Sequence, residues 1–185
     1  MNTLEKGKLA CRLLDRAIAM HFDGEDPLFV MTMAHPAHLI LQKLAERKFP
    51  DKNSSRLVWD QLESKRIKEL EDGSVIHNYN GFLNFLHRVP NAAKHAEKPT
   101  ETHVTYDESN SVSIMVMALS HAQQLECISS TGIRFIMWTV LLSDEPHAPE
   151  FLEIAETEFP GLRQMTRAEQ LRSGREAIAR TSSPA

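Results

Sequence analysis

The chain has 185 residues, with 21 Lys or Arg, 25 Asp or Glu and 9 His, and a formal net charge of −4. This length suits one domain with a single core, because a typical domain has roughly 150 residues. The 42% hydrophobic and 25% charged residues exclude bulk disorder. The negative net charge argues against nucleic-acid binding through overall charge, and it leaves a local basic patch open.

The start of the chain and its two cysteines bear on where the protein works. Residues 1–8 lead into no apolar core of a secretory signal, and no apolar stretch approaches the roughly 18 residues of a membrane helix. We therefore expect a cytoplasmic protein without a membrane partner. Cys11 and Cys127 lie in apolar helical patterns, so we expect both to be reduced thiols in the core.

Apolar residues recur at the helical period in the first quarter of the chain. They predict a helix over 4–20 and a second helical region over 27–47, separated by a turn in which Asp26 caps the second helix and Pro27 begins it. Pro36 lies inside the second region and cannot donate a backbone hydrogen bond. We therefore expect this helix to kink or restart at Pro36.

The middle of the chain has less regular patterns. A third helix is predicted over about 55–71, and a fourth helical region over about 80–97 with an interruption at Pro90. Apolar and polar residues alternate over 102–107, which predicts a short extended segment. One such segment cannot form a sheet alone.

The last part of the chain contains the most apolar helical patterns. Four helices are predicted here, over 112–128, 133–142, 150–159 and from about residue 166. The first of them has Ser109 or Ser111 as its cap and is apolar nearly all round, which marks a central, buried helix. The whole chain predicts an all-α, single-domain helical bundle of about six to eight helices. Its bundle domain is expected over 1–162, followed over 163–185 by a peripheral basic helix and a frayed tail.

The densest polar cluster on an apolar background lies at 87–95. His87, Asn91 and His95 are spaced four residues apart, so they share one stripe of a continuous helix. His95 would act as a general base near neutral pH, and Arg88 or Lys94 would stabilise developing negative charge. In a binding role, His87 and Lys94 would contact the ligand. This chemistry suits metal-independent cleavage of RNA or binding of a nucleotide. The structural alternative gives Asn91 and His95 hydrogen bonds between helices and leaves the other three side chains in solvent.

Three short segments carry a further signal. They are Leu-Leu-Asp-Arg-Ala-Ile at 13–18, Phe-Asp-Gly-Glu-Asp-Pro at 22–27 and Asn-Ala-Ala-Lys-His-Ala at 91–96. Together they resemble a family of uncharacterised bacterial helical proteins, in which an acidic turn ends in Asp-Pro and a later helix carries an Asn-x-x-Lys-His-Ala core. The resemblance covers about the first two thirds of the chain and implies an all-helical fold without an assigned activity.

Arg88 followed by His95 is similar to the Arg…His signature of HEPN domains, which are small helical bundles. Many HEPN proteins are RNases of toxin–antitoxin and defence systems. The resemblance implies that Arg88 and His95 are catalytic, that Asn91 orients the substrate or the imidazole, and that the partner is RNA.

His35 and His38 form a second candidate site. Two histidines three residues apart on one helix can ligate one metal ion. The third ligand would come from another helix, from His21, His95 or His121. In the alternative interpretation, Pro36 pushes His35 out of helical geometry, and His38 is a polar residue at the boundary of the core.

The sequence contains no glycine-rich phosphate loop, nucleophile elbow or calcium loop, so we expect no cofactor. The leading hypothesis is therefore a cytoplasmic, bacterial-type helical protein that works by binding. The apolar helices over 112–128 and 133–142 favour a homodimer. The HEPN-like RNase is the alternative, and a metalloprotein using His35 and His38 is the second alternative.

Overall fold

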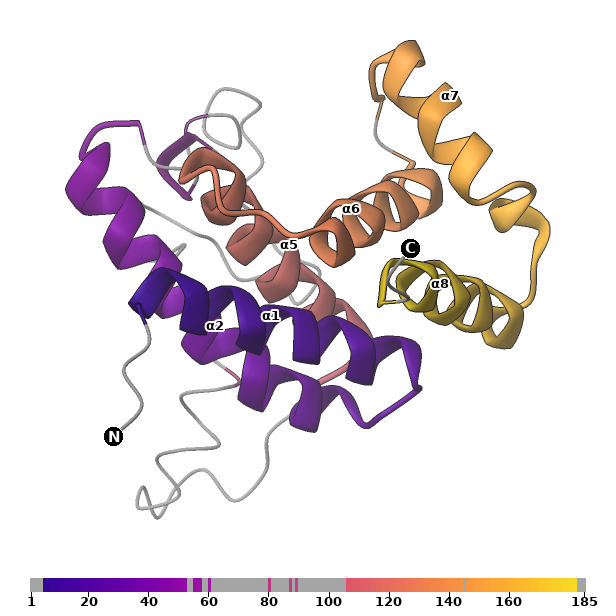
Figure 1. Ribbon diagram of the computed structural model, residues 1–185, viewed down its shortest axis with the longest axis horizontal. Coiled ribbons are helices and arrows are strands. Elements are labelled where there is room, and N and C mark those ends of the chain that lie inside the picture. The colour runs from indigo at the N-terminus through magenta and orange to yellow at the C-terminus, as the bar shows by residue number, and fades with distance from the viewer. Residues whose placement is uncertain are drawn as a thin grey trace.

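The computed structural model describes residues 5–52, 55–57, 60, 80, 87, 89, 106–144 and 146–182. Every regular element in these residues is a helix, which confirms the predicted all-α bundle (Figure 1). The helices are α1 (Lys6–Phe22), α2 (Pro27–Lys48), α5 (Glu108–Gln124), α6 (Ser130–Leu142), α7 (Pro149–Glu158), the 3₁₀ helix η1 (Leu162–Gln164) and α8 (Arg167–Ser182). No helix in the described ranges is both long and apolar enough to cross a bilayer.

The turn between α1 and α2 confirms the predicted cap. The Asp26 carboxylate accepts a hydrogen bond from the backbone N–H of Leu28 at 2.8 Å, and Pro27 occupies the first position of α2. Gly24 has a φ of 75°, a left-handed conformation that residues with a Cβ rarely adopt. The chain can therefore reverse within a few residues, and α1 packs against α2.

The predicted restart at Pro36 is wrong, because α2 is a single helix from Pro27 to Lys48 with Pro36 inside it. An internal proline loses one backbone hydrogen bond and costs about 3 kcal/mol in an ordinary helix. Here the residues on both sides are packed in the core, and Ala34 and Ala37 have no exposed surface. This burial offsets the missing bond, so His35 keeps its helical geometry.

The predicted start of the central helix near residue 112 is also wrong, because α5 begins at Glu108 with Asp107 as its N-cap. The Asp107 carboxylate accepts a hydrogen bond from the backbone N–H of Asn110 at 3.3 Å. The Asn110 side-chain oxygen accepts one from the backbone N–H of Asp107 at 3.0 Å. This reciprocal capping box satisfies two backbone donors, whereas a serine cap would satisfy one.

Helices α1, α2 and α5 pack together, and α6 leads from α5 towards α7 and α8 (Figure 1). α5 is buried on several sides, as its apolar pattern predicts, with Ile114, Met115 and Leu119 in the core. α7 packs against α6 and projects away from α1 and α2 in Figure 1. The bundle therefore has a three-helix body, and the C-terminal helices are attached mainly through α6.

The aromatic ring of Phe22 is the point at which α8 meets the bundle. Phe22 has no exposed surface, and its ring meets those of Phe135 and Trp138 edge-on, with centroids 5.7 and 5.3 Å away. Gly174 of α8 lies so close to this ring that a Cβ would overlap it. The indole N–H of Trp138 donates to the backbone oxygen of Gln170 at 3.1 Å. These contacts hold α8 against α1 and α6.

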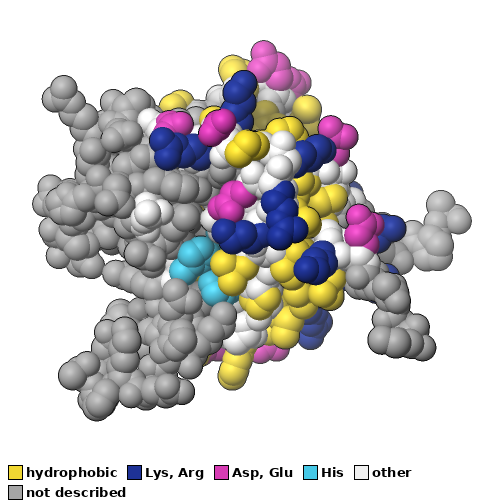
Figure 2. All heavy atoms as spheres, turned by 90° about the vertical axis from the view of Figure 1, so that its left-hand side faces the viewer, with side chains coloured by type: hydrophobic (Ala, Val, Ile, Leu, Met, Phe, Trp, Pro, Cys, Tyr) yellow, Lys and Arg dark blue, Asp and Glu magenta, His cyan; other side chains and the backbone are white. Residues whose placement is uncertain are grey.

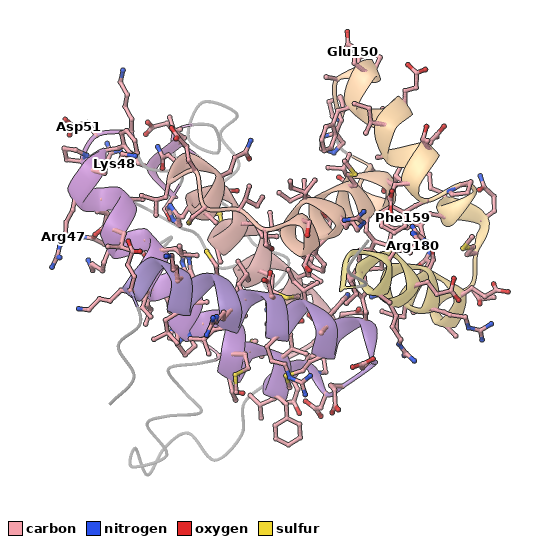
Figure 3. The ribbon with its side chains drawn as sticks, in the orientation of Figure 1. Arg47, Lys48, Asp51, Glu150, Phe159 and Arg180 are labelled. Atoms are coloured by element: carbon pink, nitrogen blue, oxygen red, sulfur yellow. The ribbon has the colours of Figure 1, made fainter. Side chains whose placement is uncertain are left out.

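One carboxylate joins the last three α-helices. Glu158, at the end of α7, accepts hydrogen bonds from Arg134 of α6 at 3.0 Å and from Arg180 of α8 at 2.6 Å. Figure 3 labels Arg180 and Phe159, the residue that follows Glu158 in the sequence. Phe159 is fully buried, so the ion pairs lie beside an apolar contact.

Candidate functional site

Four histidine side chains from three parts of the chain meet inside the bundle. His35 and His38 belong to α2, His121 belongs to α5, and His87 is a helical residue between them in the sequence. Their exposed fractions are 2%, 0%, 0% and 9%, so all four imidazoles are buried. We call these four side chains the buried histidine cluster.

The four rings form a row. The Nε2 atom of His35 and the Nδ1 atom of His87 lie 3.0 Å apart, which is a hydrogen-bond distance. The ring of His38 is stacked between those of His87 and His121, with centroids 5.0 and 5.4 Å away. At the far end, the Ser55 hydroxyl lies 2.9 Å from Nε2 of His121. The row thus has a hydrogen bond at each end and two stacked contacts in its middle.

The middle of the row contains polar atoms without partners. Both ring nitrogens of His38 and the Nδ1 atom of His121 are buried and make no hydrogen bond. Burial lowers the pKa of His38 well below its usual value, and the neighbouring imidazoles lower it further. Burial also lowers the pKa of His121 to about 4. Both rings are therefore neutral at physiological pH, and each carries a nitrogen lone pair into the interior.

The helical period explains how the cluster assembles. His35 and His38 are three residues apart on α2, so they lie on the same side of that helix. His121 is flanked on α5 by Ala118 and Ala122, which are buried and small. Small side chains let two helices approach closely, and α2 and α5 share an extensive contact. The packing of α2 on α5 therefore brings His121 to His38.

The structure describes some of the residues of the predicted sites. It brings together His35, His38 and His121, and it places His21 elsewhere. The interpretation that His35 leaves helical geometry and that His38 is a boundary residue is wrong, since both are buried within α2. His87, expected in solvent under the structural alternative, is buried against His35. The remaining residues of the polar cluster, Arg88, Asn91, Lys94 and His95, lie outside the described residues.

A second constellation was not predicted from the sequence. His21 of α1, Glu108 of α5 and Arg167 of α8 meet at a cleft of about 190 Å³. Arg167 forms an ion pair with Glu108, lies 3.4 Å from Nε2 of His21, and stacks over the ring of Trp138 at 4.7 Å. Burial and the Arg167 charge lower the pKa of His21 to about 4. No sequence spacing links these residues, because they join only when α8 docks.

This constellation acts as a clamp on α8, so Arg167→Ala should lower the free energy of unfolding by about 1–2 kcal/mol. The loss comes from the cation–π contact with Trp138 and the ion pair with Glu108. Arg172→Ala is a matched control, since Arg172 is an exposed residue of the same helix. Urea unfolding of both variants measures the difference in their free energies of unfolding. Equal values for the two variants would show that Arg167 does not stabilise the docking of α8.

Neutral, buried imidazoles are the form of histidine that ligates transition metals. Within the described part of the chain, however, no three His, Cys, Asp or Glu side chains are arranged around a common point as ligands of one ion. Stacking of His38 between two rings directs the nitrogens to different points. The cluster thus has metal-binding donor atoms that are not aligned in this structure.

Comparisons of the chain with models of protein families, with curated proteins and with solved structures found no match.

Proposed function

We propose that the protein binds a transition-metal ion through the buried histidine cluster. The observation that carries this proposal is His38, whose two ring nitrogens are fully buried without a hydrogen-bond partner. Leaving a buried polar atom unpaired costs about 1–3 kcal/mol, so native proteins rarely do so without a reason. A neutral imidazole has one nitrogen lone pair and one N–H, and an ion bound by the lone pair would remove that cost at one of the two nitrogens.

The donor atoms indicate the class of ion. Imidazole nitrogen suits Zn²⁺, Ni²⁺, Co²⁺ and Cu²⁺, whereas Mg²⁺ and Ca²⁺ prefer carboxylate and carbonyl oxygen. The three groups that would bind the ion are His38, His121 and the pair of His35 with His87. The Ser55 hydroxyl would orient His121 from outside the ligand set, as partners of metal-binding histidines commonly do.

Binding requires the rings to turn. His38 must leave its stacked position between His87 and His121 before its nitrogen and theirs can point to one ion. No hydrogen bond of the His38 ring or of the Nδ1 atom of His121 has to be broken for this turn. Metal affinity is therefore expected to be moderate, since stacking is lost on binding.

The experiment titrates untagged apo-protein with Zn²⁺, Ni²⁺ and Co²⁺ at neutral pH. We expect one equivalent of at least one ion to bind by calorimetry and by elemental analysis, and Co²⁺ to give a visible absorption spectrum. Binding to the folded state alone should also raise Tm, and a chelator should reverse the rise. Less than a tenth of an equivalent of every ion would overturn the proposal.

His38→Gln tests the cluster itself, and His21→Gln is the matched control. Both histidines are buried, but only His38 belongs to the cluster. We expect His38→Gln to weaken binding by about 10–100-fold or more while His21→Gln binds as the unaltered protein does. Equal losses in both variants, or none in His38→Gln, would contradict the assignment. Circular dichroism establishes first that each variant is folded.

A further inference from the structure

The two cysteines of the chain lie side by side although 116 positions separate them. Their Sγ atoms are 3.4 Å apart, and the Cys11 thiol also lies 3.1 Å from the backbone oxygen of Cys127. Both are free thiols and half-buried. Cys11 belongs to α1 and Cys127 to the connection between α5 and α6, so a bond between them would join two different parts of the bundle.

One of the two half-buried cysteines lines a pocket at the surface. Cys127 lines a pocket of about 460 Å³, whose wall includes three basic side chains and one acidic side chain. They are Lys6, Arg47, Lys48 and Glu5. Arg47 and Lys48 lie at the outer end of α2 in Figure 3. The face drawn in Figure 2 carries Lys and Arg side chains together with Asp, Glu and hydrophobic ones. The pocket thus attracts anions, and Cys127 is the thiol in its wall.

We propose that Cys11 and Cys127 are a redox-active dithiol, which an anionic low-molecular-weight disulfide entering this pocket oxidises to an intramolecular disulfide. The proximity of the two sulfur atoms, the pocket beside Cys127 and the excess of basic side chains around it carry this proposal. It is independent of metal binding, because no residue of the buried histidine cluster lines the pocket.

The reaction has two exchange steps. The Cys127 thiolate attacks one sulfur of the external disulfide, which breaks that S–S bond and releases one thiolate. Cys11 then gives up its proton to solvent, and its thiolate attacks the Cys127 sulfur of the mixed disulfide, which breaks the mixed S–S bond and releases the second thiolate to take up a proton. Two protein thiols are oxidised by two electrons, and one external disulfide is reduced to two thiols. The protein sulfur atoms move from 3.4 Å to a bond of about 2.05 Å.

The surroundings assign the two roles. Burial raises the pKa of Cys11 to about 12, and the hydrogen bond to Cys127 and the charge of Asp15 act in the same direction. Cys11 therefore keeps its proton at neutral pH and is a poor first nucleophile. Cys127 reacts first, because it is the thiol that lines the pocket, and Cys11 resolves the mixed disulfide.

The experiment incubates the reduced protein with glutathione disulfide, which is anionic, and in parallel with cystamine, which is cationic. Intact mass and thiol counts should show loss of two hydrogens and of both thiols, in a monomer on a non-reducing gel. Glutathione disulfide should react about fivefold faster or more than cystamine. The new bond closes a long loop, so Tm should rise by about 5–10 °C.

Single variants separate the steps. Cys11→Ser should stop at a mixed disulfide of Cys127 with one glutathione, and Cys127→Ser should remain unmodified. Lys48→Gln should slow the reaction with glutathione disulfide at least about twofold, whereas Arg172→Gln, which is remote from the pocket, should not. A stable mixed disulfide in the unaltered protein, a cross-linked dimer, or no reaction would each overturn the proposal. A faster reaction of cystamine would overturn the role of the basic pocket.

Discussion

Acidification from about pH 6.5 to pH 4 is expected to remove roughly 3 kcal/mol from the free energy of unfolding through His121 alone, and a similar amount through His21. Burial lowers the pKa of each to about 4, from an ordinary value near 6.5. The unfolded chain therefore binds protons that the native state excludes. The stabilisation is complete above the unfolded pKa and is lost as pH falls through this window, and His38 acts in the same direction.

Urea unfolding at several pH values between about 7 and 4 measures this effect, because the slope of unfolding free energy against pH counts the protons bound on unfolding. We expect the protein to bind more than one proton on unfolding near pH 5. His121→Gln should reduce the slope of unfolding free energy against pH by the contribution of one imidazole, even though it lowers stability at neutral pH. A curve that stays level down to pH 5 would show that these imidazoles are not held neutral by the fold.

Gly174→Ala should lower the free energy of unfolding by about 2–3 kcal/mol. An added Cβ would lie 2.2 Å from Cε1 and 2.4 Å from Cδ1 of Phe22. That ring cannot yield easily, since it is fully buried between Phe135 and Trp138. Helix propensity alone favours alanine over glycine by about 1 kcal/mol, so the overlap reverses the sign of the expected change.

The control for this prediction is Gly7→Ala. Gly7 also lies in a helix, but its Cβ would lie 3.9 Å from Cδ1 of Leu44, which is an ordinary contact. We expect Gly7→Ala to raise stability by up to about 1 kcal/mol. Thermal and urea unfolding of the two variants should therefore change in opposite directions. A stabilised Gly174→Ala protein would mean that α8 does not rest on Phe22.

The α-helices of the described residues were predicted to within about four residues, because periodicity and capping are local properties, whereas the helices predicted over 55–71 and 80–97 lie mostly outside the described residues. Asp26 and Pro27 mark the start of α2 by their own chemistry, and the structure confirms it. The error at Pro36 has a physical cause: burial of its neighbours outweighs one lost hydrogen bond, and burial is not a local property. Asp107 was missed because its reciprocal partner, Asn110, is not the usual acid of a capping box.

The candidate sites were less accessible from sequence, because each of them joins distant segments. The spacing of His35 and His38 gave half of the buried histidine cluster, but the stacking of His121 on His38 follows from the packing of α2 on α5. Cys11 and Cys127 were predicted as two reduced core thiols, without a contact between them. Only the fold brings their sulfur atoms together. The predictions for Arg88, Asn91 and His95, and for a homodimer, stay predictions.

The length of α2 has a practical consequence. Its 22 residues form a rod of about 33 Å. Val30 near one end lines the Arg167 cleft, His35 and His38 occupy the centre, and Leu44 and Arg47 at the other end line the pocket beside Cys127. A tilt or shift of α2 would disturb the Arg167 cleft, the buried histidine cluster and the pocket beside Cys127 together. A mutation at any one of these sites therefore has to be accompanied by measurements at the other two, because residues of the same helix contribute to all three.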